Sequence, residues 1–334
     1  MSRPATLVCA GRELFKSFFP TSQAKRLSEV CDWQLEGSND ITKLRKKLAS
    51  AEVLITTWDS PKFSEDLSRL GPKLRLISHC GGEVKSRFAR PLFERITITN
   101  AADPMARATA EMGAALLLYG ARNIDYYRDK MRKRSNRIYK QMHLHGNVEG
   151  LAGREVAMIG FGRIGRALID LMGGFQPTWI VYDPYAPRHL AKDYPVRFVE
   201  LDELLSRAEL LVLTAALTDE TRGLLNRKSL AKLPNHALIV NIARGGLIDL
   251  DALTREVKSG RLRCAIDVTD PLEPLPVNHS IRRLPGAIVT PHIAASYRKV
   301  REQIANVVMD DIESFFAGRG VRNQVTTAML DRMT

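Results

Sequence analysis

The sequence predicts an α/β protein made of two units with parallel sheets, closed by a helix near the C-terminus. Strand-like apolar runs alternate with amphipathic segments along almost the whole chain, which is typical of βαβ units. Several runs, such as Glu209–Thr214 and Ala237–Asn241, are almost continuously apolar, as expected for strands covered on both faces. The chain has 334 residues, of which 45% are hydrophobic, so two domains with sizeable cores can form.

The first hundred residues contain the elements of the first predicted unit. Strands are expected at Ala5–Ala10, Glu52–Thr57, Leu74–Ser78 and Ile96–Asn100, with helices at Thr21–Val30, Ile41–Ala49 and Phe63–Leu70. A long helix rich in alanine and leucine is then predicted from Ala106 to Arg122.

A basic stretch separates this unit from the second series of strands. Residues 122–140 hold eight Lys or Arg against two Asp, and the part from Arg128 to Lys140 has no clear apolar face. Beyond it, strands are predicted at Glu155–Gly160, Trp179–Asp183, Glu209–Thr214, Ala237–Asn241, Arg263–Val268 and Ala287–Thr290. Apolar residues at helical spacing predict the closing helix over Ser296–Ala317.

Composition excludes several classes of protein. No apolar run reaches the roughly 18 residues of a transmembrane helix, and the first fifteen residues lack the apolar core of a signal peptide. The four cysteines are scattered without a CxxC pair, which argues against a disulfide scaffold or a zinc module. We therefore expect a cytoplasmic protein without a membrane or metal partner.

The net charge of +13 is unevenly distributed. It amounts to +6 over residues 1–100 and +4 over 101–150, but only +2 over 151–296. No helix-turn-helix, zinc-finger or aromatic RNA-binding motif accompanies the basic residues, so we expect no specific nucleic-acid partner; salt-dependent retention on DNA would support that alternative. The charge is interpreted as a basic surface that attracts anionic substrates.

The strongest local motif is Gly160-Phe-Gly162-Arg-Ile-Gly165, which follows the apolar strand EVAMI and opens a helix. In such a turn the first glycine permits the tight bend, the second lets a pyrophosphate approach the backbone, and the third allows close packing of helix and strand. Asp183, at the end of the next strand, is placed to bind the ribose hydroxyls, which favours NAD over NADP. Arg188 nearby leaves some use of NADP open.

Two further motifs follow predicted strands. In Asn241-Ile-Ala-Arg244-Gly-Gly-Leu-Ile-Asp249, the arginine is a planar cation that can grip a carboxylate with two hydrogen bonds. The alternative is a structural arginine paired with Asp249 or Asp251. In Thr290-Pro-His292, the histidine is the side chain that changes protonation near neutral pH without a large shift.

Together with the acidic stretch Asp267–Pro276, these motifs resemble the D-isomer-specific 2-hydroxyacid dehydrogenase family over nearly the whole chain. The resemblance implies a Rossmann-type NAD-binding domain, residues 103–297, inserted into a smaller flavodoxin-like substrate domain of residues 1–102 and 298–334. It also implies a homodimer.

The resemblance assigns roles to the motif residues. Arg244 is expected to bind the substrate carboxylate, His292 to act as general acid and base, and Glu273 to orient the imidazole. Glu273 comes six residues after Asp267, whereas five is commoner in the family, so Asp270 remains the rival partner of His292. The family counterpart of Asp267 lies close to the nicotinamide.

Further contacts follow from the same resemblance. The remaining expected NAD-binding residues are Thr109, Arg163, Ile164, Ile242 and Ala243. The backbone amides of Gly81 and Gly82, after the strand LRLIS, are expected to hold the substrate carboxylate. Trp58 is either part of the pocket wall or a core residue.

The predicted function is NAD(H)-dependent hydride transfer to or from C2 of a small 2-keto or 2-hydroxy acid. Two alternatives stay open within the resemblance. One is a catalytically weak NAD(H)-sensing interaction protein like the C-terminal-binding-protein corepressors, which resemble the same family. The other is a dehydrogenase acting on phosphoglycerate or phosphite.

Overall fold

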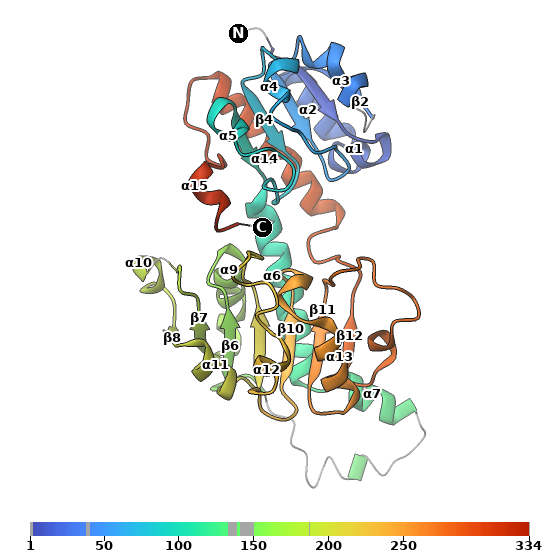
Figure 1. The fold of residues 1–334 in the computed structure, drawn as a ribbon, viewed down its shortest axis with the longest axis vertical. Coiled ribbons are helices and arrows are strands. Elements are labelled where there is room, and N and C mark those ends of the chain that lie inside the picture. Colours follow the sequence, from blue (N-terminus) through green and yellow to red (C-terminus); the bar gives the residue numbers. More distant parts are fainter. Residues whose placement is uncertain (1–2, 38–40, 133–138, 141–149, 187, 334) are drawn as a thin grey trace. The chain divides into compact units, whose positions relative to one another are not determined.

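The computed structural model describes residues 3–37, 41–132, 139–140, 150–186 and 188–333. The chain forms two compact units, one of Met1–Met105 with Ala295–Thr334 and one of Ala106–Ala294. Both are α/β units with wholly parallel sheets, which confirms the predicted fold class (Figure 1). The second unit is inserted into the sequence of the first.

The first unit contains a five-stranded sheet in the order β2-β1-β3-β4-β5, which is the flavodoxin-like order. Its strands are β1 (Ala5–Cys9), β2 (Asp32–Glu36), β3 (Val53–Thr56), β4 (Leu76–His79) and β5 (Thr97–Asn100). Its helices are α1 (Arg12–Phe18), α2 (Thr21–Val30), α3 (Ile41–Leu48), α4 (Leu67–Leu70), α5 (Leu92–Arg95), α14 (Arg298–Phe316) and α15 (Thr327–Leu330).

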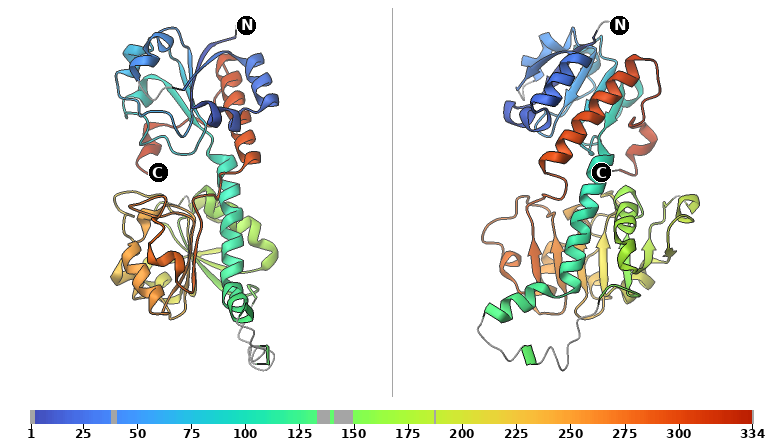
Figure 2. Two further views of the ribbon diagram at one scale, coloured as in Figure 1. Left: turned by 90° about the vertical axis from the view of Figure 1, so that its right-hand side faces the viewer. Right: turned by 180° about the vertical axis from the view of Figure 1, so that it is seen from behind.

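Alternate strand residues bury opposite faces of this sheet. Leu7, Leu54 and Ile77 share a core with Leu44 and residues of α4 and α5. The long helix α14 packs against α1, α2 and β4, as the views in Figure 2 show for α14 and the two N-terminal helices. Helix α14 therefore belongs to the first unit, although it follows the second unit in the sequence.

The second unit contains a seven-stranded sheet in the order β12-β11-β10-β9-β6-β7-β8. Its strands are β6 (Glu155–Ile159), β7 (Thr178–Tyr182), β8 (Val196–Phe198), β9 (Leu210–Leu213), β10 (Leu238–Asn241), β11 (Arg263–Ile266) and β12 (Ala287–Val289). Its helices include α7 (Ile124–Arg132), α9 (Arg163–Met172), α10 (Arg188–Ala191), α11 (Leu201–Arg207), α12 (Arg227–Leu230) and α13 (Leu250–Lys258). Helix α6 (Ala102–Ala121) begins in the first unit and continues in the second.

Both faces of the second sheet are covered, which explains its apolar strands. On one face, Leu117 of α6 and Leu168 of α9 share a core with Val156 and Val240. On the other, residues of α11, α12 and α13 pack against the alternate strand residues, among them Ile239. The dinucleotide motif lies at the carboxyl end of β6, in the middle of this sheet.

The structure differs from the sequence prediction at several elements. No helix was predicted for α1, α5, α7, α10, α11, α12, α13 or α15. Strands β2 and β8 were not predicted; they lie at sheet edges and are only partly buried, so they lack a continuous apolar run. The helix expected over Phe63–Leu70 is reduced to α4, because Phe63 instead pairs with Phe88 in a parallel bridge and stacks on its ring at 5.6 Å. None of the described helices is long and apolar enough to span a membrane.

Candidate functional site

The glycine-rich turn after β6 has a different requirement at each glycine. Gly160 has φ +99°, and a Cβ there would lie 2.4 Å from the backbone nitrogen of Ala215. Gly165 has similarly little room, since a Cβ would come within 2.7 Å of the Gly160 carbonyl oxygen. A Cβ on Gly162 would meet no heavy atom within 4 Å, so the backbone there is open to approach. These are the three properties that a dinucleotide-binding turn needs.

Arg163 and Ile164 form the first turn of α9, a ten-residue helix that starts directly after Gly162. The first amides of a helix lack intrahelical acceptors, and the helix dipole makes this end positive. The open face of Gly162 and the start of α9 thus suit a pyrophosphate.

Asp183, directly after β7, helps to shape the same turn. One carboxylate oxygen accepts a hydrogen bond from the amide of Phe161 at 2.7 Å, and the other accepts one from the amide of Tyr185 at 2.9 Å. A carboxylate has about four acceptor sites, so acceptor capacity remains for ribose hydroxyls. The turn, the helix start and the acid lie together, and these residues fit NAD.

The loop after β10 places Arg244 and is organised by Asn241. The Asn241 side chain accepts from the amide of Ala243 at 3.1 Å and donates to the carbonyl of Arg244 at 3.0 Å. Ile242 and Ala243 are buried, whereas Arg244 is half-buried and donates to the Ala243 carbonyl at 2.8 Å. The Asp249 carboxylate caps α13 through the amide of Ala252 at 2.9 Å, so this part of the motif has a structural role.

The loop after β11 carries the acidic residues and packs on the Arg244 loop. A Cβ on Gly245 would lie 2.2 Å from the carbonyl carbon of Thr269, so only glycine permits this approach. The amide of Thr269 donates to Glu273 at 3.3 Å. Asp270 points elsewhere, with a carboxylate oxygen 3.9 Å from the guanidinium of Arg222.

His292 and Glu273 form a direct pair. Nδ1 of His292 lies 2.9 Å from Oε2 of Glu273, and both side chains are partly exposed. A carboxylate accepts only, so Nδ1 carries the hydrogen and Nε2 remains for proton transfer. His292 also has φ +53°, the left-handed region that a residue with a Cβ rarely adopts.

Asp267 holds the His292 loop in this conformation. Its buried carboxylate accepts hydrogen bonds from the hydroxyl of Thr290 at 2.5 Å and from the amides of Ile293 at 3.0 Å and Ala294 at 2.9 Å. Its carbonyl accepts from the amide of His292 at 2.9 Å. Sequence reasoning placed Asp267 near the nicotinamide and missed these contacts; its position at the end of β11, beside β12, was the available signal.

The remaining predicted residues have distinct settings. Thr109 is buried in α6. In the first unit, the amide of Gly81 donates to the carbonyl of His79 at 2.8 Å, and the Gly82 carbonyl accepts from the Asn100 side chain at 2.7 Å. His79 is itself buried with Nδ1 2.9 Å from the Thr56 hydroxyl, and burial lowers its pKa to about 3.

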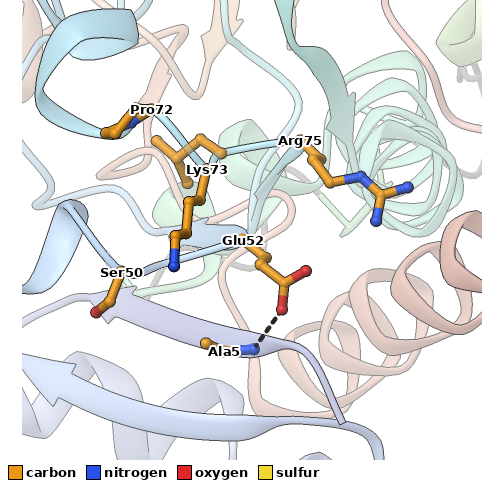
Figure 3. A pocket seen from close by; sticks show the side chains of 7 residues that line it. Ala5, Ser50, Glu52, Pro72, Lys73 and Arg75 are labelled. Atoms are coloured by element: carbon orange, nitrogen blue, oxygen red, sulfur yellow. Dashed lines mark hydrogen bonds between the residues drawn. The ribbon is translucent and has the colours of Figure 1, made fainter. Parts of the chain in front are cut away.

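A separate surface pocket lies at the amino ends of the central strands of the first sheet (Figure 3). It is lined by Ala5, Ser50, Glu52, Pro72, Lys73, Leu74 and Arg75. These residues precede or begin β1, β3 and β4, whereas ligands of such sheets bind at the carboxyl ends of strands. No predicted site residue lines this pocket.

Comparison with known proteins gives consistent matches. Residues 114–294 match the family model described as the NAD-binding domain of D-isomer-specific 2-hydroxyacid dehydrogenases. D-3-phosphoglycerate dehydrogenase of Methanocaldococcus jannaschii is 31% identical over 308 residues, which cover 90% of this chain and 56% of that protein. Hydroxypyruvate reductase of Thermotoga maritima is 30% identical over 285 residues, which cover 84% of this chain and 88% of that protein. This chain thus spans about half the length of the phosphoglycerate dehydrogenases that it matches.

Solved structures agree with the sequence matches. A crystal structure of a protein from Thermus thermophilus aligns over 96% of this chain and 99% of its own, with a TM-score of 0.76 and 29% identity. A phosphoglycerate oxidoreductase from Rhizobium etli has a TM-score of 0.83 at 22% identity, over 98% of this chain and all of that chain, which shows a shared fold.

Proposed function

Because the chain belongs to the D-isomer-specific 2-hydroxyacid dehydrogenase family, we propose that it transfers a hydride between NAD(H) and C2 of a D-2-hydroxy acid or its 2-keto counterpart. The observation that best supports this proposal is the contact of 2.9 Å between Nδ1 of His292 and Glu273, next to the loop that contains Arg244. In this proposal, different residues bind the substrate, orient it and transfer the proton.

Bound NAD(H) supplies or accepts the hydride, and the turn of Gly160, Gly162 and Gly165 with Asp183 would hold it. Thr109, Arg163, Ile164, Ile242 and Ala243 are the other proposed contacts to this cofactor. The backbone of Asp267, within the second unit, extends the same site toward the His292 loop.

Arg244 binds the substrate carboxylate with two hydrogen bonds and stabilises negative charge that develops on the C2 oxygen. Gly81 and Gly82 of the first unit are further proposed contacts to the substrate; the amide of Gly82 is the available donor, since that of Gly81 already donates to the His79 carbonyl. His292 gives a proton to the C2 oxygen in reduction and takes it back in oxidation, while Glu273 keeps Nε2 available.

We also propose a homodimer and a cytoplasmic location. Helix α7 buries none of its residues within its own chain, and Ile124, Tyr126 and Met131 on it are large exposed apolar side chains. Covering such a face in a second copy removes apolar surface from water. The four cysteines are buried and unpaired, which suits a reducing compartment. Light scattering of purified protein measures the oligomeric state directly.

The function is tested with purified protein, NADH or NADPH, and a panel of 2-keto acids including glyoxylate and hydroxypyruvate. We expect reduction with NADH, production of the D isomer, and a fall of kcat/KM by about 10²-fold or more in Arg244→Gln. Glu273→Gln lowers kcat by about tenfold or more, whereas Asp270→Asn, the matched control, stays near wild type. Absence of any reduction, or equal losses in the two carboxylate variants, contradicts the proposal.

A further inference from the structure

Asp311 is a buried acid in the C-terminal half of α14 that the proposed mechanism does not use. Its side chain accepts a hydrogen bond from the side-chain amide of Asn323 at 3.0 Å through Oδ1. Its Oδ2 is buried and has no hydrogen-bond partner among the described residues, and burial raises the pKa of this carboxyl. Burying a carboxylate with an unpaired oxygen costs free energy, so the packing of α14 alone does not account for an acid at this position.

Asn323 belongs to the segment that follows α14 and runs along β5, the edge strand of the first sheet. The carbonyl of Asn323 accepts a hydrogen bond from the amide of Asn100, the last residue of β5, at 3.2 Å. Two residues further on, the amide of Val325 donates to the carbonyl of Ile98 at 2.8 Å. The contact with Asp311 therefore fixes the start of this segment at the carboxyl end of β5.

The carboxyl end of β5 in turn holds the glycine loop. The buried side chain of Asn100 donates to the carbonyl of Gly82 at 2.7 Å, and the amide of the next residue, Ala101, donates to the carbonyl of Gly81 at 2.9 Å. Within the described part of the chain, the amide of Gly82 donates to no acceptor. The loop is thus fixed through its carbonyls, and one amide stays available.

A series of three hydrogen bonds therefore joins α14 to the glycine loop inside the first unit. The first of them has a carboxylate as acceptor, and such bonds are about twice as strong as those between neutral groups. The neighbouring acid on the helix, Asp310, is exposed and pairs with Arg26 at 2.6 Å instead. Of these two adjacent acids, Asp311 is the one that is connected to the glycine loop.

We infer that Asp311 is a positioning residue that acts through Asn323 and Asn100 to hold the amide of Gly82 where it binds the substrate. This inference rests on the proposed function, in which Gly82 contacts the substrate. A displaced amide weakens the binding of the substrate and of the transition state alike, so its loss raises KM and leaves kcat unchanged. The KM of NADH stays constant, because the proposed cofactor contacts lie in the second unit.

The test measures KM and kcat for a 2-keto acid and KM for NADH. Asp311→Ala removes the acceptor and is expected to raise the KM of the 2-keto acid about tenfold, with kcat within about twofold of wild type. Asn323→Ala removes the donor but leaves the carbonyl for Asn100, and it is expected to give the same rise. Asp311→Asn keeps an oxygen for Asn323 and restores KM to within about threefold of wild type, and Asp310→Ala, the matched control, changes nothing. The double variant Asp311→Ala/Asn323→Ala is no worse than either single variant, because both remove the same bond.

A binding measurement separates this inference from the proposed function. The dissociation constants of glycolate, D-lactate and D-glycerate are measured by calorimetry with NADH bound, so that no turnover occurs, on proteins whose folding is checked by circular dichroism. If no 2-keto acid is reduced, the proposed function fails, and the affinities of wild type, Asp311→Ala and Asn323→Ala still decide the role of Asp311. If Asp311→Ala does not fold, Asn323→Ala decides it. Unchanged affinity and KM in the folded variants, equal rises in KM for the 2-keto acid and NADH, or a wild type that binds none of the three acids overturns the inference.

Discussion

Replacing Asp267 with asparagine tests whether this buried carboxylate holds the general acid in place. Its side chain is 1% exposed and accepts three hydrogen bonds, from Thr290 and from the amides of Ile293 and Ala294. In asparagine, the side-chain oxygen can still accept from the Thr290 hydroxyl and the Ile293 amide. The side-chain amino group then faces the amide of Ala294, and no hydrogen bond forms there because both groups are donors. One charge-assisted bond is lost and one buried donor is left unpaired, so we expect a loss of about 2–4 kcal/mol in the free energy of unfolding.

The catalytic effect follows from the backbone of His292. Its left-handed φ of +53° costs about 1–2 kcal/mol, which the bonds to Asp267 offset. When those bonds weaken, the loop relaxes and the pairing with Glu273 is disturbed. A displacement of about 1 Å at a catalytic group lowers rates by about 10²-fold, and we expect kcat to fall by that order.

The assay combines urea unfolding with steady-state reduction of a 2-keto acid by NADH. Asp249→Asn is the matched control, because asparagine caps a helix about as well as aspartate and the α13 cap is retained. An Asp267→Asn protein with stability within about 0.5 kcal/mol and kcat within twofold of wild type would refute the reasoning.

Two other predictions concern the glycine turn and a buried histidine. Gly160→Ala is expected to abolish NAD binding measured by calorimetry, because a Cβ at φ +99° would meet the Ala215 backbone at 2.4 Å; Gly174→Ala, with open space around it, retains binding. Burial lowers the pKa of His79 from 6.5 to about 3, so between these pH values the unfolded chain binds a proton that the folded chain does not. The free energy of unfolding therefore falls as pH drops below 6.5, by up to about 1.4 kcal/mol per pH unit. Urea unfolding at pH 7 and pH 5 should show a smaller acid-induced loss in His79→Gln than in wild type, with the exposed His189→Gln unchanged from wild type; equal losses in all three would contradict the assignment.

Local sequence patterns predicted most of the strands and the longest helices. Apolar runs located the central strands of both sheets because those strands are buried on both faces. The edge strands β2 and β8 were not predicted. Their residues are only partly buried, so they form no continuous apolar run, and their pairing depends on a neighbouring strand. The helix expected from Phe63 was shortened by pairing with Phe88, a contact that no local pattern encodes.

The sequence by itself determined the chemistry available to this protein: a glycine turn after a strand, an acid 18 residues after the last glycine, and an arginine and a histidine at strand ends. Tertiary structure decided which groups meet. It paired His292 with Glu273 rather than Asp270, and it placed the Asp267 carboxylate against the backbone of the His292 loop. The physical reason is that turns and periodicity depend on residues near one another in the chain, whereas these contacts depend on the register of parallel strands.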